Sequence, residues 1–238
     1  MAEPEALELR QAELAAIAAE VRACQLCKLH RGATHGVPGE GPATAEILFI
    51  GEGPGFHEDQ QGRPFVGASG KFLEEMLASI GLQREQVFIA NVVKHRPPNN
   101  RDPEPDEIAA CSGYLDRQIA AIDPLLIVTL GRYSMRKFFP GASISAIHGQ
   151  PKLVDGRPVV PMFHPAAALH QQSLRQTLLD DFKKLPRFIK RARERREEIA
   201  QQGVSAVAAA VEPEPPPPAS QPPATDEPPA PPTQLSLF

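Results

Sequence analysis

The chain has 238 residues, with 29 acidic and 25 basic side chains and a formal net charge of −4. This length suits one α/β domain with extensions, and the net negative charge argues against a nonspecific nucleic-acid coat. Apolar runs stay well below the roughly 20 residues of a membrane span, and no basic segment precedes an apolar one at the start. We therefore expect a cytoplasmic monomer without a membrane segment or a secretory signal.

The apolar pattern alternates between strands and helices along the chain. Residues 5–23 have the spacing of an amphipathic helix. Four short apolar runs are typical of buried strands: 47–50, 87–92, 125–130 and 157–163. Helical spacing follows each of them, over 69–80, 104–121, 131–138 and 173–199. This alternation predicts a three-layer α/β/α fold with a mostly parallel central sheet.

The last part of the chain has a different composition. Residues 203–233 are rich in proline, contain acidic but no basic side chains, and lack large apolar residues apart from valine. Such a segment cannot bury enough apolar surface to fold, so we expect a disordered, extended linker. Residues 1–202 then form the folded domain, which carries equal numbers of acidic and basic side chains. That balance permits DNA binding through a local basic patch.

Polar, glycine-rich segments follow three of the predicted strands. Gly51–Gly55 and Glu58–Gly67 come after the first strand, Asn91–Arg101 after the second and His164–Leu169 after the fourth. Open α/β sheets bind their ligands beyond the carboxyl ends of their strands. We therefore expect a ligand site at this edge of the sheet.

The three cysteines are unevenly placed. Cys24 and Cys27 have CxxC spacing, and Cys111 follows the second polar segment. In a chain without a secretory signal, this arrangement favours a reducing compartment and a metal or cluster site over a disulfide framework.

The order and approximate spacing of these segments, from Cys24 to Phe188, resemble those of the type 4, iron–sulfur-containing uracil-DNA glycosylases. The long first segment, which ends in Pro64-Phe65-Val66-Gly67, is the most specific part of the likeness. The resemblance implies an enzyme that flips uracil out of single- or double-stranded DNA and hydrolyses its N-glycosidic bond. The product would be an abasic site for base excision repair.

The resemblance also implies roles for individual residues. Phe65 would stack on the flipped uracil, Asn91 would read its O4 and N3–H edge, and His164 would donate to O2 and stabilise the uracil anion. Gly53 would let the backbone approach the nucleotide closely. The segment around residues 169–171 resembles the one that enters the duplex.

Two carboxylates are candidates for positioning the attacking water. Related enzymes with a Gln-Asp-Pro motif use an aspartate, but Gly53 stands at the equivalent position here. We predict that Glu58 positions the water and that Glu52 has a local positioning role, with Asp59 or backbone groups as alternatives.

Type 4 enzymes hold a [4Fe–4S] cluster on four cysteines, and Cys24, Cys27 and Cys111 match three of them. His95 stands at the position of the fourth. Imidazole ligates iron–sulfur clusters in Rieske centres, so we predict a cluster held by three cysteines and His95. A cluster on three cysteines alone and a structural zinc ion are the alternatives.

The chain ends in Gln234-Leu235-Ser236-Leu237-Phe238, which resembles the motif by which bacterial repair proteins bind the sliding clamp. Gln234 and Leu235 would contact the clamp beside Leu237 and Phe238, which would fill an apolar pocket. The linker would raise the concentration of the enzyme near clamp-loaded DNA. We therefore expect a bacterial protein with the clamp as a partner.

Two other functions are compatible with the sequence. One sister group traps uracil-DNA covalently through a histidine in a basic insertion after the second segment, but no Lys/Arg-rich insertion follows Arg96 here. The other is a clamp-tethered DNA-binding module with an inactive site. The missing insertion favours a monofunctional glycosylase with turnover.

Overall fold

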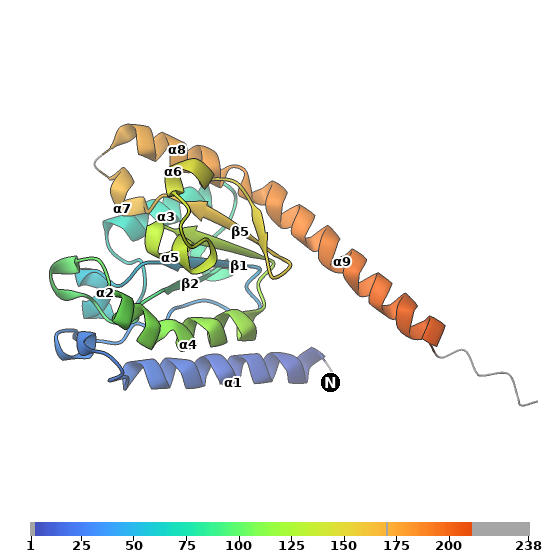
Figure 1. Ribbon diagram of the computed structural model, residues 1–238, viewed down its shortest axis with the longest axis horizontal. Helices are drawn as coiled ribbons and strands as arrows, with labels where there is room; N and C mark the ends of the chain where they lie inside the picture. Colours follow the sequence, from blue (N-terminus) through green and yellow to red (C-terminus); the bar gives the residue numbers. More distant parts are fainter. Residues whose placement is uncertain (1–2, 170, 211–238) are drawn as a thin grey trace, which may run out of the picture. The chain divides into compact units, whose positions relative to one another are not determined.

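The computed structural model describes residues 3–169 and 171–210 (Figure 1). Its centre is a five-stranded sheet with the strand order β2-β1-β3-β5-β4, parallel except for β4. The strands are β1 (Ile47–Gly51), β2 (Phe88–Asn91), β3 (Leu126–Leu130), β4 (Lys152–Val154) and β5 (Arg157–Met162). The four strands predicted from apolar runs are confirmed, and β1 is an interior strand whose end, Gly51, lies beside Asn91 of β2.

The short edge strand β4 was not predicted. It pairs with β5 through a two-residue turn at Asp155 and Gly156, where φ is +49° and +77°. Asp-Gly is a strong signal for such a hairpin turn, because both of its central residues have positive φ. The strand is too short to stand out by its apolar content, but the turn could have revealed it.

The described part of the chain forms nine α-helices. They are α1 (Glu3–Arg22), α2 (Phe56–Gln61), α3 (Ala68–Ala78), α4 (Pro105–Ile122), α5 (Arg132–Phe138), α6 (Ile144–Ile147), α7 (Pro165–Ala168), α8 (Gln172–Phe182) and α9 (Leu185–Ala210). The single helix predicted over 173–199 is wrong, since α8 and α9 replace it. Pro186 has no N–H and fits only in the first turn of a helix, so a new helix begins there.

The apolar side chains of β1 alternate between the two faces of the sheet. Phe49 belongs to the core on the side of α3 and α8, where its ring stacks on Phe182 with centroids 5.7 Å apart. Leu48 and Ile50 belong to the opposite core, under α4. This arrangement confirms the three-layer α/β/α fold, and α1 packs against the outer side of α4 (Figure 1).

Helix α9 continues to Ala210, past the boundary predicted after residue 202. Residues 204–210 are rich in alanine, which has the highest helix propensity. The lack of large apolar side chains predicted a disordered segment here, but helix propensity does not depend on such side chains. The remainder of the predicted linker and the pentapeptide 234–238 lie outside the described residues. None of the described helices has the length and apolarity needed to cross a membrane.

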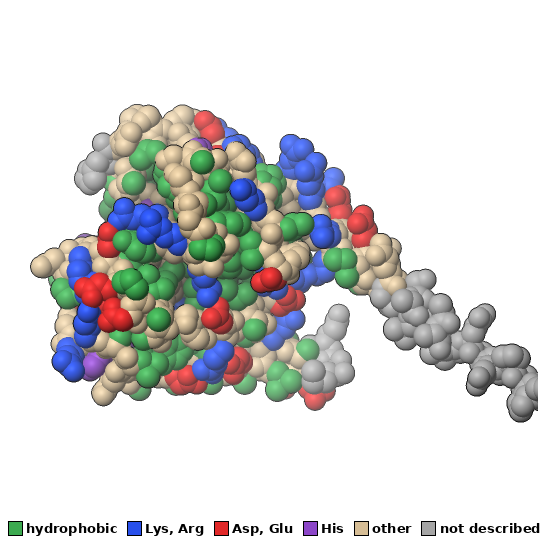
Figure 2. Space-filling view, viewed as in Figure 1, with side chains coloured by type: hydrophobic (Ala, Val, Ile, Leu, Met, Phe, Trp, Pro, Cys, Tyr) green, Lys and Arg blue, Asp and Glu red, His purple; other side chains and the backbone are tan. Residues whose placement is uncertain are grey.

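Charged side chains of both signs are mixed on the surface. Figure 2 shows Lys and Arg interspersed with Asp and Glu on the face in view. Several of them form exposed ion pairs, such as Lys28 with Glu104 and Arg132 with Asp102. Exposed pairs of this kind contribute about 0–1 kcal/mol each, so the layers are held together mainly by their apolar cores.

Candidate active-site pocket

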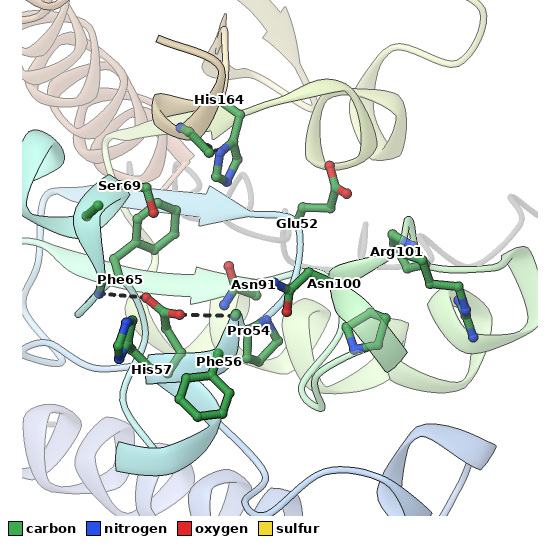
Figure 3. Close-up of a pocket in the computed structure, with 18 of the residues that line it drawn as sticks. Glu52, Pro54, Phe56, His57, Phe65, Ser69, Asn91, Asn100, Arg101 and His164 are labelled. Atoms are coloured by element: carbon green, nitrogen blue, oxygen red, sulfur yellow. Dashed lines mark hydrogen bonds between the residues drawn. The ribbon is translucent and has the colours of Figure 1, made fainter. Parts of the chain in front are cut away.

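A pocket of about 500 Å³ lies beyond the carboxyl ends of β1 and β2. Its wall includes all six residues predicted for catalysis or substrate binding: Glu52, Gly53, Glu58, Phe65, Asn91 and His164. They come from segments far apart in the sequence that follow three parallel strands. The edge of the sheet at which we expected a ligand site therefore contains a cavity of ligand size (Figure 3).

Phe65 presents an aromatic face in this pocket. The residue is 4% exposed, and its ring lies against the His164 imidazole, with centroids 5.7 Å apart and planes inclined by 27°. A Cβ on Gly51 would lie 2.6 Å from the Phe65 ring and would overlap the side-chain oxygen of Asn91. Only glycine at position 51 therefore lets the end of β1 approach both side chains.

Asn91 is the last residue of β2 and is buried. Its Oδ1 has no hydrogen-bond partner among the described residues. Buried side-chain oxygens are nearly always paired, so an orphaned one at a pocket wall indicates a partner in the ligand. The amide both donates and accepts, as a base with adjacent carbonyl and N–H groups requires.

His164 follows β5 and precedes the short helix α7. Its Nδ1 accepts a hydrogen bond from the backbone N–H of Ala166 at 3.1 Å. Burial lowers the pKa of this histidine to about 4, although the nearby Glu58 charge opposes the shift. The ring is therefore neutral at physiological pH and carries its proton on Nε2, where it can serve as a donor.

The Glu58 carboxylate joins two loops of the pocket wall. One oxygen accepts the N–H groups of Val66 at 3.0 Å and Gly67 at 2.9 Å, and the other accepts that of Gly55 at 3.1 Å. The side chain is also buried. With its oxygens engaged by backbone donors, Glu58 is poorly placed to hold a water molecule, contrary to the role predicted for it.

Glu52 differs from Glu58 in the hydrogen bonding of its carboxyl group. Figure 3 shows its carboxyl across the pocket from Phe65, with no hydrogen bond to the residues drawn. Burial raises its pKa to about 7, and the Asp102 charge adds to the shift while Arg132 opposes it. A carboxyl that titrates near neutrality in a cavity is a candidate base, so the predicted division of roles between Glu52 and Glu58 is not supported.

The segment Asn91–Arg101 was expected at this edge of the sheet, but no role in the pocket was predicted for its last two residues. Asn100 and Arg101 line the cavity, and Asn99 and Asn100 both have φ of +54°. The Pro-Pro-Asn-Asn run was a turn signal, because asparagine tolerates this conformation. The Arg101 guanidinium donates two hydrogen bonds to the Glu107 carboxylate, of 2.9 and 2.6 Å, so these donors are not available to a ligand.

The predicted cluster ligands lie where α1 packs on α4. Burial raises the pKa of Cys111 to about 11; the backbone N–H of Lys94 opposes the shift, and the nearby Cys27 and Cys24 thiols add to it. All three cysteines are free, and Cys24 and Cys27 are near enough to Cys111 to affect its pKa.

His95 lies beside this group, and it borders the same small cavity as Cys24. It is buried, its Nδ1 has no partner among the described residues, and burial lowers its pKa, which leaves the imidazole neutral. Across residues 3–169 and 171–210, no three His, Cys, Asp or Glu side chains are close enough to share a single metal ion. The donor chemistry fits a thiolate-bound group with one imidazole ligand.

Comparison with known proteins places this chain in a family. Residues 38–190 match the family model of the uracil DNA glycosylase superfamily. The type-4 uracil-DNA glycosylase of Sulfurisphaera tokodaii is 53% identical over 176 residues, which cover 70% of this chain and 80% of that protein. That of Saccharolobus solfataricus is 50% identical over 183 residues, 71% of this chain and 83% of that protein. That of Thermotoga maritima is 46% identical over 185 residues, 75% of this chain and 96% of that protein. The chain therefore belongs to the type-4 uracil-DNA glycosylases of the uracil-DNA glycosylase superfamily.

Proposed function

We propose that this protein is a monofunctional uracil-DNA glycosylase, which hydrolyses the bond between uracil and deoxyribose and leaves an abasic site. The observation that carries the proposal is the convergence of three groups in one pocket. These are the face of Phe65, the unpaired Oδ1 of the Asn91 amide and the Nε2–H of His164. The type-4 relatives bear the same activity in their names.

Base recognition follows from the first two groups. A base flipped out of the stack regains stacking on the Phe65 ring. The Asn91 amide accepts from N3–H and donates to O4 of uracil, and this pairing satisfies its orphaned oxygen. Cytosine presents an amino group and an unprotonated N3 at these positions, so it would leave buried polar groups unpaired.

Departure of the base follows from the third group. Breaking the glycosidic bond places negative charge on uracil, which spreads to O2. A neutral imidazole donates its Nε2–H to that oxygen and stabilises the anion without transferring a full proton. Because the pKa of His164 is about 4, the ring is in this form across the physiological range.

Attack on the sugar requires a water molecule near C1′. We assign its positioning to Glu52, whose carboxyl faces the pocket, rather than to Glu58. With a pKa of about 7, Glu52 is increasingly ionised as the pH rises through neutrality, and its carboxylate can accept a water proton.

Cys24, Cys27, Cys111 and His95 would hold a [4Fe–4S] cluster. The gathered thiols and the unpartnered Nδ1 of the neutral His95 support this assignment. The cluster would supply a structural cross-link between the end of α1, α4 and the loop after β2, and no step of the reaction passes through it. Equal iron and acid-labile sulfide in the purified protein is the expected result, whereas stoichiometric zinc would support the alternative.

The C-terminal pentapeptide, outside the described residues, would bind a sliding clamp through Gln234, Leu235, Leu237 and Phe238. The proposed organisation is a catalytic domain, a proline-rich linker and this motif. Deletion of residues 234–238 should leave uracil excision intact and abolish clamp binding. Unchanged clamp affinity after the deletion would contradict the assignment. The monomeric state and the cytoplasmic, bacterial location stay predictions.

The decisive test is incubation with a 5′-labelled oligonucleotide that carries one uracil. Half of each reaction is cleaved with alkali, and half is run on a denaturing protein gel. Strand scission without a shifted protein band is the expected result. A heat-stable shifted band would indicate covalent capture instead, and DNA binding with neither signal would indicate an inactive module.

A further inference from the structure

The backbone of Phe65 adopts a conformation that its side chain does not favour. Its φ is +50°, in the left-handed region. Glycine, asparagine and aspartate adopt this region most readily, and bulky residues such as phenylalanine are rare there. Such conformations persist only where the surroundings enforce them, and they cluster at functional sites. The ring that would stack on the base therefore belongs to a strained peptide, whose conformation must be stabilised by contacts with other residues.

Arg84 holds it. This residue belongs to the 3-10 helix Arg84–Gln86, before β2, and its side chain is 8% exposed. One guanidinium nitrogen donates to the carbonyl oxygen of Phe65 at 2.8 Å, and the other terminal nitrogen donates to that of Pro64. A planar guanidinium thus bridges two consecutive carbonyls on either side of the Phe65 nitrogen, a geometry that a single ammonium cannot reproduce.

The guanidinium is itself anchored from outside the loop. Its Nε lies 3.3 Å from a carboxylate oxygen of Glu40, whose backbone pairs with Ile89 of β2. On the other side of the loop, a Cβ on Gly70 would overlap the Phe65 carbonyl, so α3 presses directly against it. The peptide is fixed between the edge of the sheet and α3.

We propose that Arg84 is a positioning residue for base recognition. It acts through Phe65, by holding the left-handed peptide that sets the aromatic face against His164. The identity of the stacked base as uracil rests on the proposed function, but the contacts between Arg84 and the loop do not.

The neighbouring Arg63 provides a matched control. It makes two hydrogen bonds to the same Glu40 carboxylate, of 2.6 and 2.7 Å, and its side chain is half exposed. Because Arg63 remains, loss of Arg84 does not leave Glu40 unpaired. Arg84 Nη1 also lies 3.4 Å from the exposed Glu74 carboxylate, a contact that Arg63 does not make. A role limited to pairing with Glu40 predicts similar effects for Arg84→Lys and Arg63→Lys, whereas a role in positioning Phe65 predicts an effect of Arg84→Lys alone.

The test measures single-turnover uracil release and affinity for DNA that contains an abasic-site analogue, which offers no base to stack. We expect Arg84→Lys to slow release on the order of 10- to 100-fold with unchanged affinity for abasic DNA, and Arg63→Lys to change neither. In a Phe65→Ala background, Arg84→Lys should have little further effect, because both changes remove the same interaction.

Three results would overturn the inference: wild-type release by Arg84→Lys, equal losses in both lysine variants, or additive effects with Phe65→Ala. If Arg84→Lys does not fold, Glu40→Gln disturbs the same guanidinium from outside the loop and should slow release in the same direction, and a wild-type rate would overturn the proposal. Absence of release by the wild-type protein would instead refute the proposed function.

Discussion

Glutamine substitutions should separate Glu58 from Glu52 by the sign of their effect on stability. Glu58 accepts three backbone hydrogen bonds, of 2.9, 3.0 and 3.1 Å. In Glu58→Gln the amide nitrogen turns a donor toward at least one of these N–H groups, and the remaining bonds lose their charge. An unsatisfied buried group costs about 1–3 kcal/mol. We therefore expect the free energy of unfolding to fall by about 2–3 kcal/mol.

Glu52→Gln should have the opposite effect. The folded pKa of about 7 lies above the ordinary value of 4.5, so ionisation of Glu52 destabilises the fold. This penalty is absent below pH 4.5, grows as the pH rises and is complete above about 7. The shift corresponds to about 3 kcal/mol, or about 1–2 kcal/mol once solvent screening is considered. At pH 8 the variant should gain that stability, while uracil release falls about 10²- to 10⁴-fold.

Both effects can be measured on the same preparations. Urea and thermal unfolding at pH 8 give the stability, with about 2–4 °C expected per kcal/mol, and single-turnover release gives the rate. Glu85→Gln, at an exposed position, is the matched control and should change neither. Wild-type release by Glu52→Gln would refute the assignment of the water to Glu52. Undiminished stability of Glu58→Gln with complete loss of release would return that role to Glu58.

Further predictions follow from the same pocket and from the cluster ligands. The rate of uracil release should rise with pH through about 7 as Glu52 ionises, and a flat profile in the wild-type protein between pH 5 and 9 would contradict this. Asn91→Ala should slow release on the order of 10- to 100-fold, through loss of two hydrogen bonds to the base, without lowering the melting temperature. His95→Cys should retain iron and sulfide, whereas His95→Ala should lose visible absorbance and iron; full iron content in His95→Ala would remove His95 from the ligand set.

The sequence was sufficient to predict the four parallel strands of the sheet and the residues gathered at their carboxyl ends. Buried parallel strands are continuous apolar runs, and polar residues directly after them can only lie at the carboxyl edge. The segments that begin with Asn91 and His164 were placed at this edge on this ground, and the pocket contains both residues. The family resemblance added the roles, which the pocket geometry alone does not test.

The division of roles between Glu52 and Glu58 depends on a local structure, the N-terminal cap of α2. Glu58 is the third residue of α2, and it caps that helix by accepting the N–H of Gly55. A glutamate three residues after a helix N-cap is a known capping signal, and it was present in the sequence. The short helix α2 was not predicted, so Glu58 was not recognised as its capping residue.

Arg84 and the conformation of Phe65 were beyond the reach of sequence patterns. The two residues are 19 positions apart, and their hydrogen bond exists only because the fold brings their two segments together. Phenylalanine is not a residue that indicates positive φ. Such a contact depends on tertiary structure that neither periodicity nor turn propensity encodes.

Gly53 stands where enzymes with a Gln-Asp-Pro motif have an aspartate, and close packing leaves little room for a side chain at this position. A Cβ at position 53 would lie 2.7 Å from Cγ2 of Val93. Val93 is fully buried, and its N–H donates to the carbonyl of Glu52 at 3.1 Å, so the two loops are packed closely. A side chain at position 53 would have to displace this buried valine. The glycine therefore meets a packing requirement in addition to any approach of the nucleotide, and Glu52 is the neighbouring position from which a carboxylate reaches the cavity.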